Sequence, residues 1–120
     1  MSRLPTPRRG EVWWFDPNPV RSRELGQKVR PALIVSTDHL ARERFGKVVV
    51  VPGTSQARPN PLHVPFPHAL RGRSRLTYFC CEDVRSIDGT THLRARMGAR
   101  LVPESIMRQI EYCLRLLLEL

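Results

Sequence analysis

The 120-residue chain is predicted to form one small, mostly antiparallel β-barrel with a C-terminal helix. Short apolar or alternating segments end repeatedly at proline or glycine, which is typical of strands joined by turns. Only the segment after residue 103 has apolar residues at helical spacing. The length suits a single domain with its own core. We assign residues 1–9, which contain three arginines and two prolines, to a basic flexible arm and residues 10–120 to the domain.

The first expected strand covers residues 11–16 and carries both tryptophans. Neighbouring residues of a strand point to opposite faces, so Trp13 and Trp14 cannot share an environment. One of them is expected in the core. The prolines at 17 and 19 end the strand, because proline cannot pair within a sheet ladder.

Residues 20–29 form a polar, cationic segment with Gly26 as a hinge. A loop of this length in so small a domain is usually functional or mobile. The alternative is a solvated connection without a role.

Two apolar strands follow. The first, residues 30–36, has a continuous apolar centre and is expected to be buried on both faces. Thr37 or Asp38 can cap a short helix that ends at Gly46. The second apolar strand covers residues 47–52.

The middle of the chain is less regular. Residues 57–70 are rich in proline and are expected to hold only short edge pairing around residues 62–64. A basic turn at 71–75 precedes a strand at 76–81. Residues 82–88 then alternate in polarity, and Gly89 closes that segment.

The last element is a helix that begins at Pro103-Glu104. Its apolar residues recur at helical spacing to the C-terminus: Ile106, Met107, Ile110, Cys113, Leu114, Leu117 and Leu118. This wide stripe either covers the open end of the barrel or forms a dimer seam.

The net charge of +9 predicts a polyanionic partner. Lys28 and Lys47 are the only lysines, and arginine binds phosphates with two parallel hydrogen bonds where lysine acts as a point charge. A GC-rich genome would also favour arginine, but it would not explain the sign of the charge.

The cysteines and histidines predict no cofactor and no metal site. Cys80 and Cys81 are adjacent, which disfavours a disulfide between them, and no CxxC spacing occurs. The four histidines are scattered along the chain. No apolar stretch reaches the ~20 residues that span a membrane, and no signal peptide is visible, so we expect a cytoplasmic protein with no membrane partner.

Arg30 and Thr54 are the candidate catalytic residues. Each stands at the end of an expected buried strand, where a rigid cation and a hydroxyl can meet at one phosphate. RNA supplies its own nucleophile, the ribose 2′-hydroxyl, so an enzyme without metal must align it and stabilise the phosphorane charge. Glu24 is the nearest carboxylate in the sequence that could accept the 2′-hydroxyl proton. Common turn chemistry could equally explain Arg30-Pro31 and Thr54-Ser55.

The order of several motifs resembles the MazF/PemK (Kid) family of toxins over residues 9–118. The matching segments are Arg9-Gly10-Glu11-Val12-Trp13, Asn18-Pro19, Gly26, Arg30 to Ser36, Val51 to Gln56, Glu82 to Asp88 and the helix from Pro103-Glu104. The resemblance implies an SH3-like barrel with a C-terminal helix. It also implies a homodimeric, metal-independent endoribonuclease that cuts single-stranded RNA at short sequences and leaves 2′,3′-cyclic phosphate and 5′-hydroxyl ends.

By position, Arg30 resembles the family's catalytic arginine and Thr54 its catalytic threonine. Residues 17–29 resemble the loop that covers RNA and that the antitoxin displaces. The expected RNA-binding residues are Arg21, Arg23, Lys28, Ser55, Gln56, Asp83 and Arg85.

Three positions depart from the family pattern. The alignment of Glu24 is uncertain, because Glu24-Leu25-Gly26 stands where the family often has Glu-Gln. Asp83 replaces a frequent glutamine and cannot donate hydrogen bonds when ionised, which predicts a changed base preference. Gly53 replaces a bulkier residue and predicts a looser turn at Thr54.

The resemblance implies a cognate acidic, partly disordered antitoxin that fills the RNA groove, and DNA binding by their complex. Trp13 or Trp14 could stack on a base or lie at the dimer interface. Two rival functions remain open: a CcdB-like gyrase poison on the same fold, and a silent member that binds only RNA or antitoxin.

Overall fold

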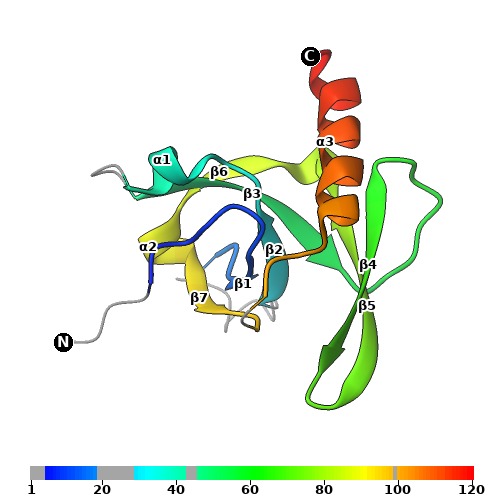
Figure 1. The fold of residues 1–120 in the computed structure, drawn as a ribbon, viewed down its shortest axis with the longest axis horizontal. Coiled ribbons are helices and arrows are strands. Elements are labelled where there is room, and N and C mark those ends of the chain that lie inside the picture. Colours follow the sequence, from blue (N-terminus) through cyan, green and yellow to red (C-terminus); the bar gives the residue numbers. More distant parts are fainter. Residues whose placement is uncertain (1–4, 19–28, 43–45, 99) are drawn as a thin grey trace.

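The fold is a twisted antiparallel sheet with one long helix beside it (Figure 1). The computed structural model describes residues 5–18, 29–42, 46–98 and 100–120. The strands are β1 (Val12–Phe15), β2 (Arg30–Ile34), β3 (Lys47–Thr54), β4 (His63–Leu70), β5 (Arg73–Cys80), β6 (Arg85–Asp88) and β7 (Leu93–Arg96). The helices are α1 (Asp38–Arg42), η1 (Cys81–Asp83), α2 (Gly89–His92) and α3 (Glu104–Leu118).

β3 is the centre of the sheet. One edge pairs with β2, and the other edge pairs first with β6 and then with β5, which gives the order β4-β5-β3-β2-β1-β7 with β6 beside β3. Every pairing is antiparallel, as predicted. Among the described residues no ladder joins the two ends, so the sheet curves as an SH3-like barrel does without closing.

The β4–β5 hairpin corrects the prediction for the middle of the chain. The segment at 57–70 was expected to pair only briefly, but β4 pairs with β5 over all eight of its residues. β4 has β5 on one side and no strand on the other. Pro65 and Pro67 have no N–H to donate, and a proline is tolerated where it faces a free edge, because no partner strand needs that donor. The basic turn is also shorter than predicted, because β5 begins at Arg73.

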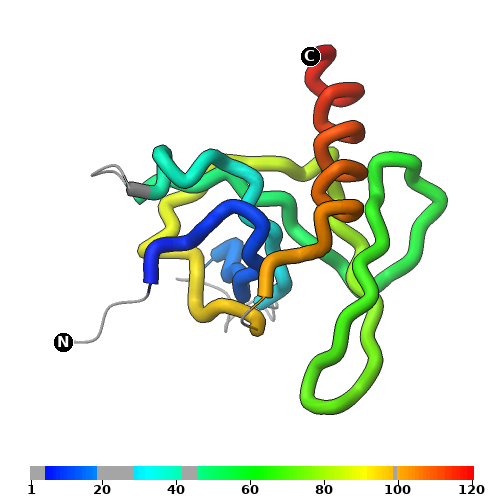
Figure 2. The backbone as a smooth tube through the Cα atoms, viewed as in Figure 1, coloured from blue at the N-terminus to red at the C-terminus, as the bar shows by residue number. Residues whose placement is uncertain are grey.

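The segment after β5 differs from the expected continuous alternation. Residues 81–83 form η1, and only Arg85–Asp88 extend as β6. Gly89 was expected to close this segment, but it begins α2. The Asp88 carboxylate caps the N-terminus of that helix. Neither α2 nor β7 was predicted. Figure 2 shows the β7 segment returning beside β1, with which it pairs.

α3 covers one face of the sheet and completes the larger of two core clusters. Ile106, Ile110 and Cys113 are buried against β-strand side chains such as Leu33 and Phe79. This confirms the predicted helix and shows that part of its apolar stripe packs on the sheet. Tyr112, Leu116 and Leu118 of α3 stay exposed, as does Leu120 after the helix, so Leu118 is not part of the buried stripe as predicted.

The structure decides between the two tryptophans. Trp13 is fully buried in the smaller cluster, and its Nε1 donates to Glu11 at 3.1 Å. Trp14 is half-buried and lines a cleft.

The end of the predicted arm is held to the body. The Arg8 amide donates to Glu11, and the Arg9 amide donates to Asp38 at 2.7 Å. The Arg9 guanidinium bonds the carbonyl of Val35 and pairs with Glu111 on α3. Arg8 and Arg9, which were assigned to the arm, therefore contact the body of the domain.

Candidate functional site

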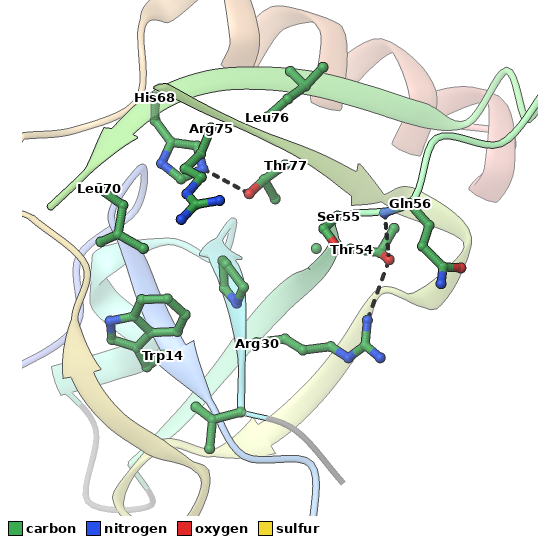
Figure 3. A pocket seen from close by; sticks show the side chains of 13 residues that line it. Trp14, Arg30, Thr54, Ser55, Gln56, His68, Leu70, Arg75, Leu76 and Thr77 are labelled. Atoms are coloured by element: carbon green, nitrogen blue, oxygen red, sulfur yellow. Dashed lines mark hydrogen bonds between the residues drawn. The ribbon is translucent and has the colours of Figure 1, made fainter. Parts of the chain in front are cut away.

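Arg30 and Thr54 meet at the surface. Arg30 Nη1 lies 3.4 Å from Thr54 Oγ1, and the guanidinium is exposed (Figure 3). The β2–β3 pairing explains the meeting: Ala32 pairs with Pro52, so two residues further along Arg30 stands opposite Thr54. Directly opposed residues of an antiparallel pair point to the same face. The rigid end of two paired strands thus positions both groups.

The turn after β3 holds the Thr54 hydroxyl from a second side. The amide of Gln56 donates to Thr54 Oγ1 at 3.2 Å, and Arg58 Nη2 donates to Gln56 Oε1 at 2.9 Å. Ser55 and Gln56 are exposed and line the same cleft as Arg30. The hydroxyl oxygen accepts from an amide on one side and a guanidinium on the other, which leaves its hydrogen to be donated to another group.

Gly53 has a different role from the one expected. It was predicted to loosen the turn at Thr54, but it pairs with Phe79 within the sheet. A Cβ at this position would lie 2.5 Å from Thr77 Cγ2 and 3.3 Å from the carbonyl oxygen of Pro31. Glycine is therefore what allows β2, β3 and β5 to approach closely beside Thr54.

Arg30 and Thr54 border a cleft of about 250 Å³ whose far wall comes from β1 and the β4–β5 hairpin. In Figure 3, Arg30 extends toward Thr54 and Gln56, with Ser55 beside them, and a second group of residues stands across the cleft. That far wall includes Trp14, His68, Leu70, Arg75, Leu76 and Thr77. It combines an indole, a cation and apolar surface, which is the chemistry that holds unstacked bases.

His68 is the titratable group of the far wall. Its Nε2 lies 2.9 Å from Thr77 Oγ1, and among the described residues nothing bonds its buried Nδ1. Burial lowers the pKa of His68, and the nearby Arg75 cation lowers it further. The imidazole is therefore neutral at pH 7 and can both donate and accept a hydrogen bond.

The two remaining predicted RNA contacts lie outside the cleft lining. Asp83 is exposed on η1, and its backbone carbonyl accepts a hydrogen bond from Arg85 Nε at 3.3 Å. The Arg85 guanidinium lies over the ring of Phe15, 5.7 Å from its centroid. Phe15 pairs with Arg30, so Arg85 contacts the residue that lies opposite Arg30 in the sheet.

Four predicted site residues lie outside the described residues: Arg21, Arg23, Glu24 and Lys28. So does most of the predicted covering loop at 17–29.

Sequence reasoning missed the far wall of the cleft. Arg75 was seen only as part of a basic turn, and His68 only as one of four scattered histidines. The prolines of β4 argued against a paired strand there, so nothing in the local sequence brought the two residues together.

No helix among the described parts of the chain is long and apolar enough to span a bilayer.

The model of the PemK-like, MazF-like toxins of type II toxin–antitoxin systems matches residues 8–118. The chain belongs to this family. It is 33% identical over 118 residues to endoribonuclease MazF9 of Mycobacterium tuberculosis (strain ATCC 25618 / H37Rv), which covers 94% of this chain and 97% of that protein. The resemblance seen in the sequence is thereby confirmed.

Solved MazF structures have the same fold. Crystalline MazF from Deinococcus radiodurans superposes with a TM-score of 0.72 at 24% identity, covering 97% of this chain and 99% of that one. A mycobacterial endoribonuclease in complex with its cognate antitoxin has a TM-score of 0.71 at 25% identity, covering 95% and 96%. The sheet with its C-terminal helix is thus the fold of MazF toxins, as predicted.

Proposed function

We propose that this MazF-like toxin is an endoribonuclease that cuts single-stranded RNA without a metal ion and leaves 2′,3′-cyclic phosphate and 5′-hydroxyl ends. The proposal rests chiefly on the meeting of Arg30 and Thr54 at an exposed position in a chain of this family. Relatives named as endoribonucleases support it over a CcdB-like gyrase poison.

In this mechanism the ribose 2′-oxygen attacks the phosphorus, and the bond to the 5′-oxygen breaks. Arg30 donates two charge-assisted hydrogen bonds to the non-bridging oxygens, where negative charge increases in the transition state. The Thr54 hydroxyl, oriented by the Gln56 amide, bonds a further oxygen. The 3.4 Å separation of Arg30 and Thr54 is long for a hydrogen bond, so little is lost when both turn to a phosphate.

A base must take the 2′-hydroxyl proton. Among the described residues that line the cleft none is a carboxylate. We therefore retain Glu24 as the proposed proton acceptor, on its chain position and the resemblance. Arg21, Arg23, Lys28, Asp83 and Arg85 remain proposed RNA contacts.

The proposed partners are a cognate acidic antitoxin, a second copy of this chain and RNA in the cytoplasm. The antitoxin complex of the mycobacterial relative supports the first of these. The positive charge of this chain suits an acidic antitoxin that occupies the groove instead of RNA.

The decisive experiment incubates purified protein with a long single-stranded RNA in EDTA and maps the cut ends. We expect sparse cuts with cyclic-phosphate ends. Arg30→Ala should lower kcat/KM at least about 30-fold, which is the effect of losing about 2 kcal/mol of transition-state stabilisation. Arg108→Ala is the matched control, since Arg108 is exposed on α3 and pairs with Glu104.

Two results would reject the proposal: loss of wild-type cleavage on adding EDTA, or a full rate in Arg30→Ala. Gyrase-dependent DNA breaks without RNA cleavage would instead restore the rival function.

A further inference from the structure

A cluster outside the cleft brings together a histidine, a cysteine and a glutamate. One ligand atom each from His63, Cys80 and Glu82 lies within 4.8 Å of the others. His63 begins β4, and Cys80, which ends β5, is its direct pairing partner. Their side chains therefore share a face, and η1 returns Glu82 to the same place. We propose that these three residues bind a zinc ion.

The donor set fits zinc better than the other common divalent ions. Imidazole nitrogen, thiolate sulfur and carboxylate oxygen are its usual ligands, whereas magnesium and calcium take oxygen alone. In a tetrahedral zinc site neighbouring ligand atoms are about 3.3–3.6 Å apart. Zinc binding would require the contact of His63 Nε2 with Glu82 Oε2, now 2.7 Å, to open to that separation. Three protein ligands leave the fourth position for water.

The His63 side chain is held inside the protein at the cluster. It is only 5% exposed, and its Nε2 lies 2.7 Å from Glu82 Oε2. Zinc would bind this nitrogen, and the imidazole would then carry its proton on Nδ1. Burial of the ring limits the rotamers open to it, so Nε2 is already positioned toward the other two ligands.

The surroundings support a bound cation. Asn60 Nδ2 donates to Glu82 Oε2 at 3.1 Å and would orient the carboxylate from outside the ligand shell. The Cys80 thiol donates to the carbonyl of Tyr78 at 3.6 Å in the free protein. Zinc would displace that proton.

The zinc site is separate from the proposed catalysis. The nuclease mechanism uses no metal, and none of the three ligands lines the cleft beside Arg30. The Glu82 side chain, 32% exposed, provides the route of entry. Zinc would connect β4, β5 and η1 near the end of β5. Thr54 pairs with Tyr78 in the same part of that strand.

The test titrates tag-free, reduced protein with Co²⁺ as a spectroscopic substitute and then displaces it with Zn²⁺. We expect one equivalent of Co²⁺ to produce a thiolate-to-cobalt absorption band that Zn²⁺ abolishes. Cys80→Ser should remove the band, and Asn60→Ala should weaken Zn²⁺ binding about tenfold. Cys113→Ser and His39→Gln are matched controls outside the cluster and should retain it.

Absence of the band in folded wild-type protein would overturn the proposal, as would a band that survives Cys80→Ser. The wild-type titration decides even if that variant does not fold. The readout is independent of RNA cleavage, so failure of the zinc site and failure of the nuclease proposal are distinguishable.

Discussion

At the scale of single residues, the proposed chemistry depends on how closely three strands approach beside Thr54. Gly53 permits that approach, because any side chain there would meet Thr77 Cγ2 and the Pro31 carbonyl. Arg30 is exposed and Thr54 is partly buried, and both are common residue types at a protein surface. What makes them a candidate site is their relative position, which the buried neighbours maintain.

Gly53→Ala should lower both stability and cleavage. The new methyl must displace Thr77 or Thr54, at a cost of about 1–3 kcal/mol for overpacking. Urea unfolding and RNA cleavage would measure the two effects. The double variant Gly53→Ala/Thr77→Ser removes the methyl that Cβ would strike at 2.5 Å, and it should recover part of both losses. If the single variant were as stable as wild type, the three strands would accommodate the added methyl group without strain, which would contradict this assignment.

At the scale of elements, a buried carboxylate joins the edge strand β7 to its neighbour β1. Glu11, only 4% exposed, accepts hydrogen bonds from the Arg8 amide at 2.7 Å, Trp13 Nε1 at 3.1 Å and Arg96 Nη1 at 3.0 Å. Burial alone would raise the pKa of this carboxyl, but the three hydrogen bonds and the Arg96 charge together lower it below 4.5. The ionised carboxylate therefore stabilises the contact between β1 and β7.

Because the folded state lowers this pKa, the stabilisation is complete above about pH 4.5 and is lost as the pH falls through the folded value. Glu11→Gln should reduce the free energy of unfolding at pH 7 by about 1–3 kcal/mol and flatten its decline in acid. Denaturant titrations across that pH range would measure both. Glu104→Gln is the control, since its exposed pair with Arg108 is worth less than about 1 kcal/mol. An unchanged acid profile in Glu11→Gln would contradict this assignment.

At the scale of the whole molecule, the net charge of +9 acts over the entire surface that we propose to bind RNA. The β4–β5 hairpin extends this surface away from the body (Figure 1), with Arg73 and Arg75 exposed along β5. Arg75 also lines the cleft that Arg30 borders. RNA that enters the cleft thus has a cationic strand beside it, and its binding should weaken as salt increases.

Replacing Arg73 and Arg75 with glutamine should weaken RNA binding and reduce its salt dependence. If each arginine neutralises one phosphate, the slope of log Kd against log salt falls by about 0.7 per residue. The measurement uses RNA with 2′-O-methyl groups, which lacks the nucleophile and stays intact. Arg108→Gln should leave the slope unchanged. A slope equal to that of wild type in the double variant would place RNA away from the hairpin.

The sequence by itself determined the kinds of groups present and the elements that depend on near neighbours. Composition set the positive charge, apolar periodicity located β2, β3 and α3, and the order of motifs identified the family and its two catalytic candidates. These features depend on local spacing, so they can be read along the chain.

Only the tertiary structure decided which distant segments meet. β4 pairs along its whole length despite its prolines, because one of its edges is free and β5 supplies a partner that local propensity does not reveal. The same pairing places His68 across from Arg30 and sets His63 beside Cys80 and Glu82. Strand register, which is fixed by the whole core, determines such contacts, and no short stretch of sequence encodes it.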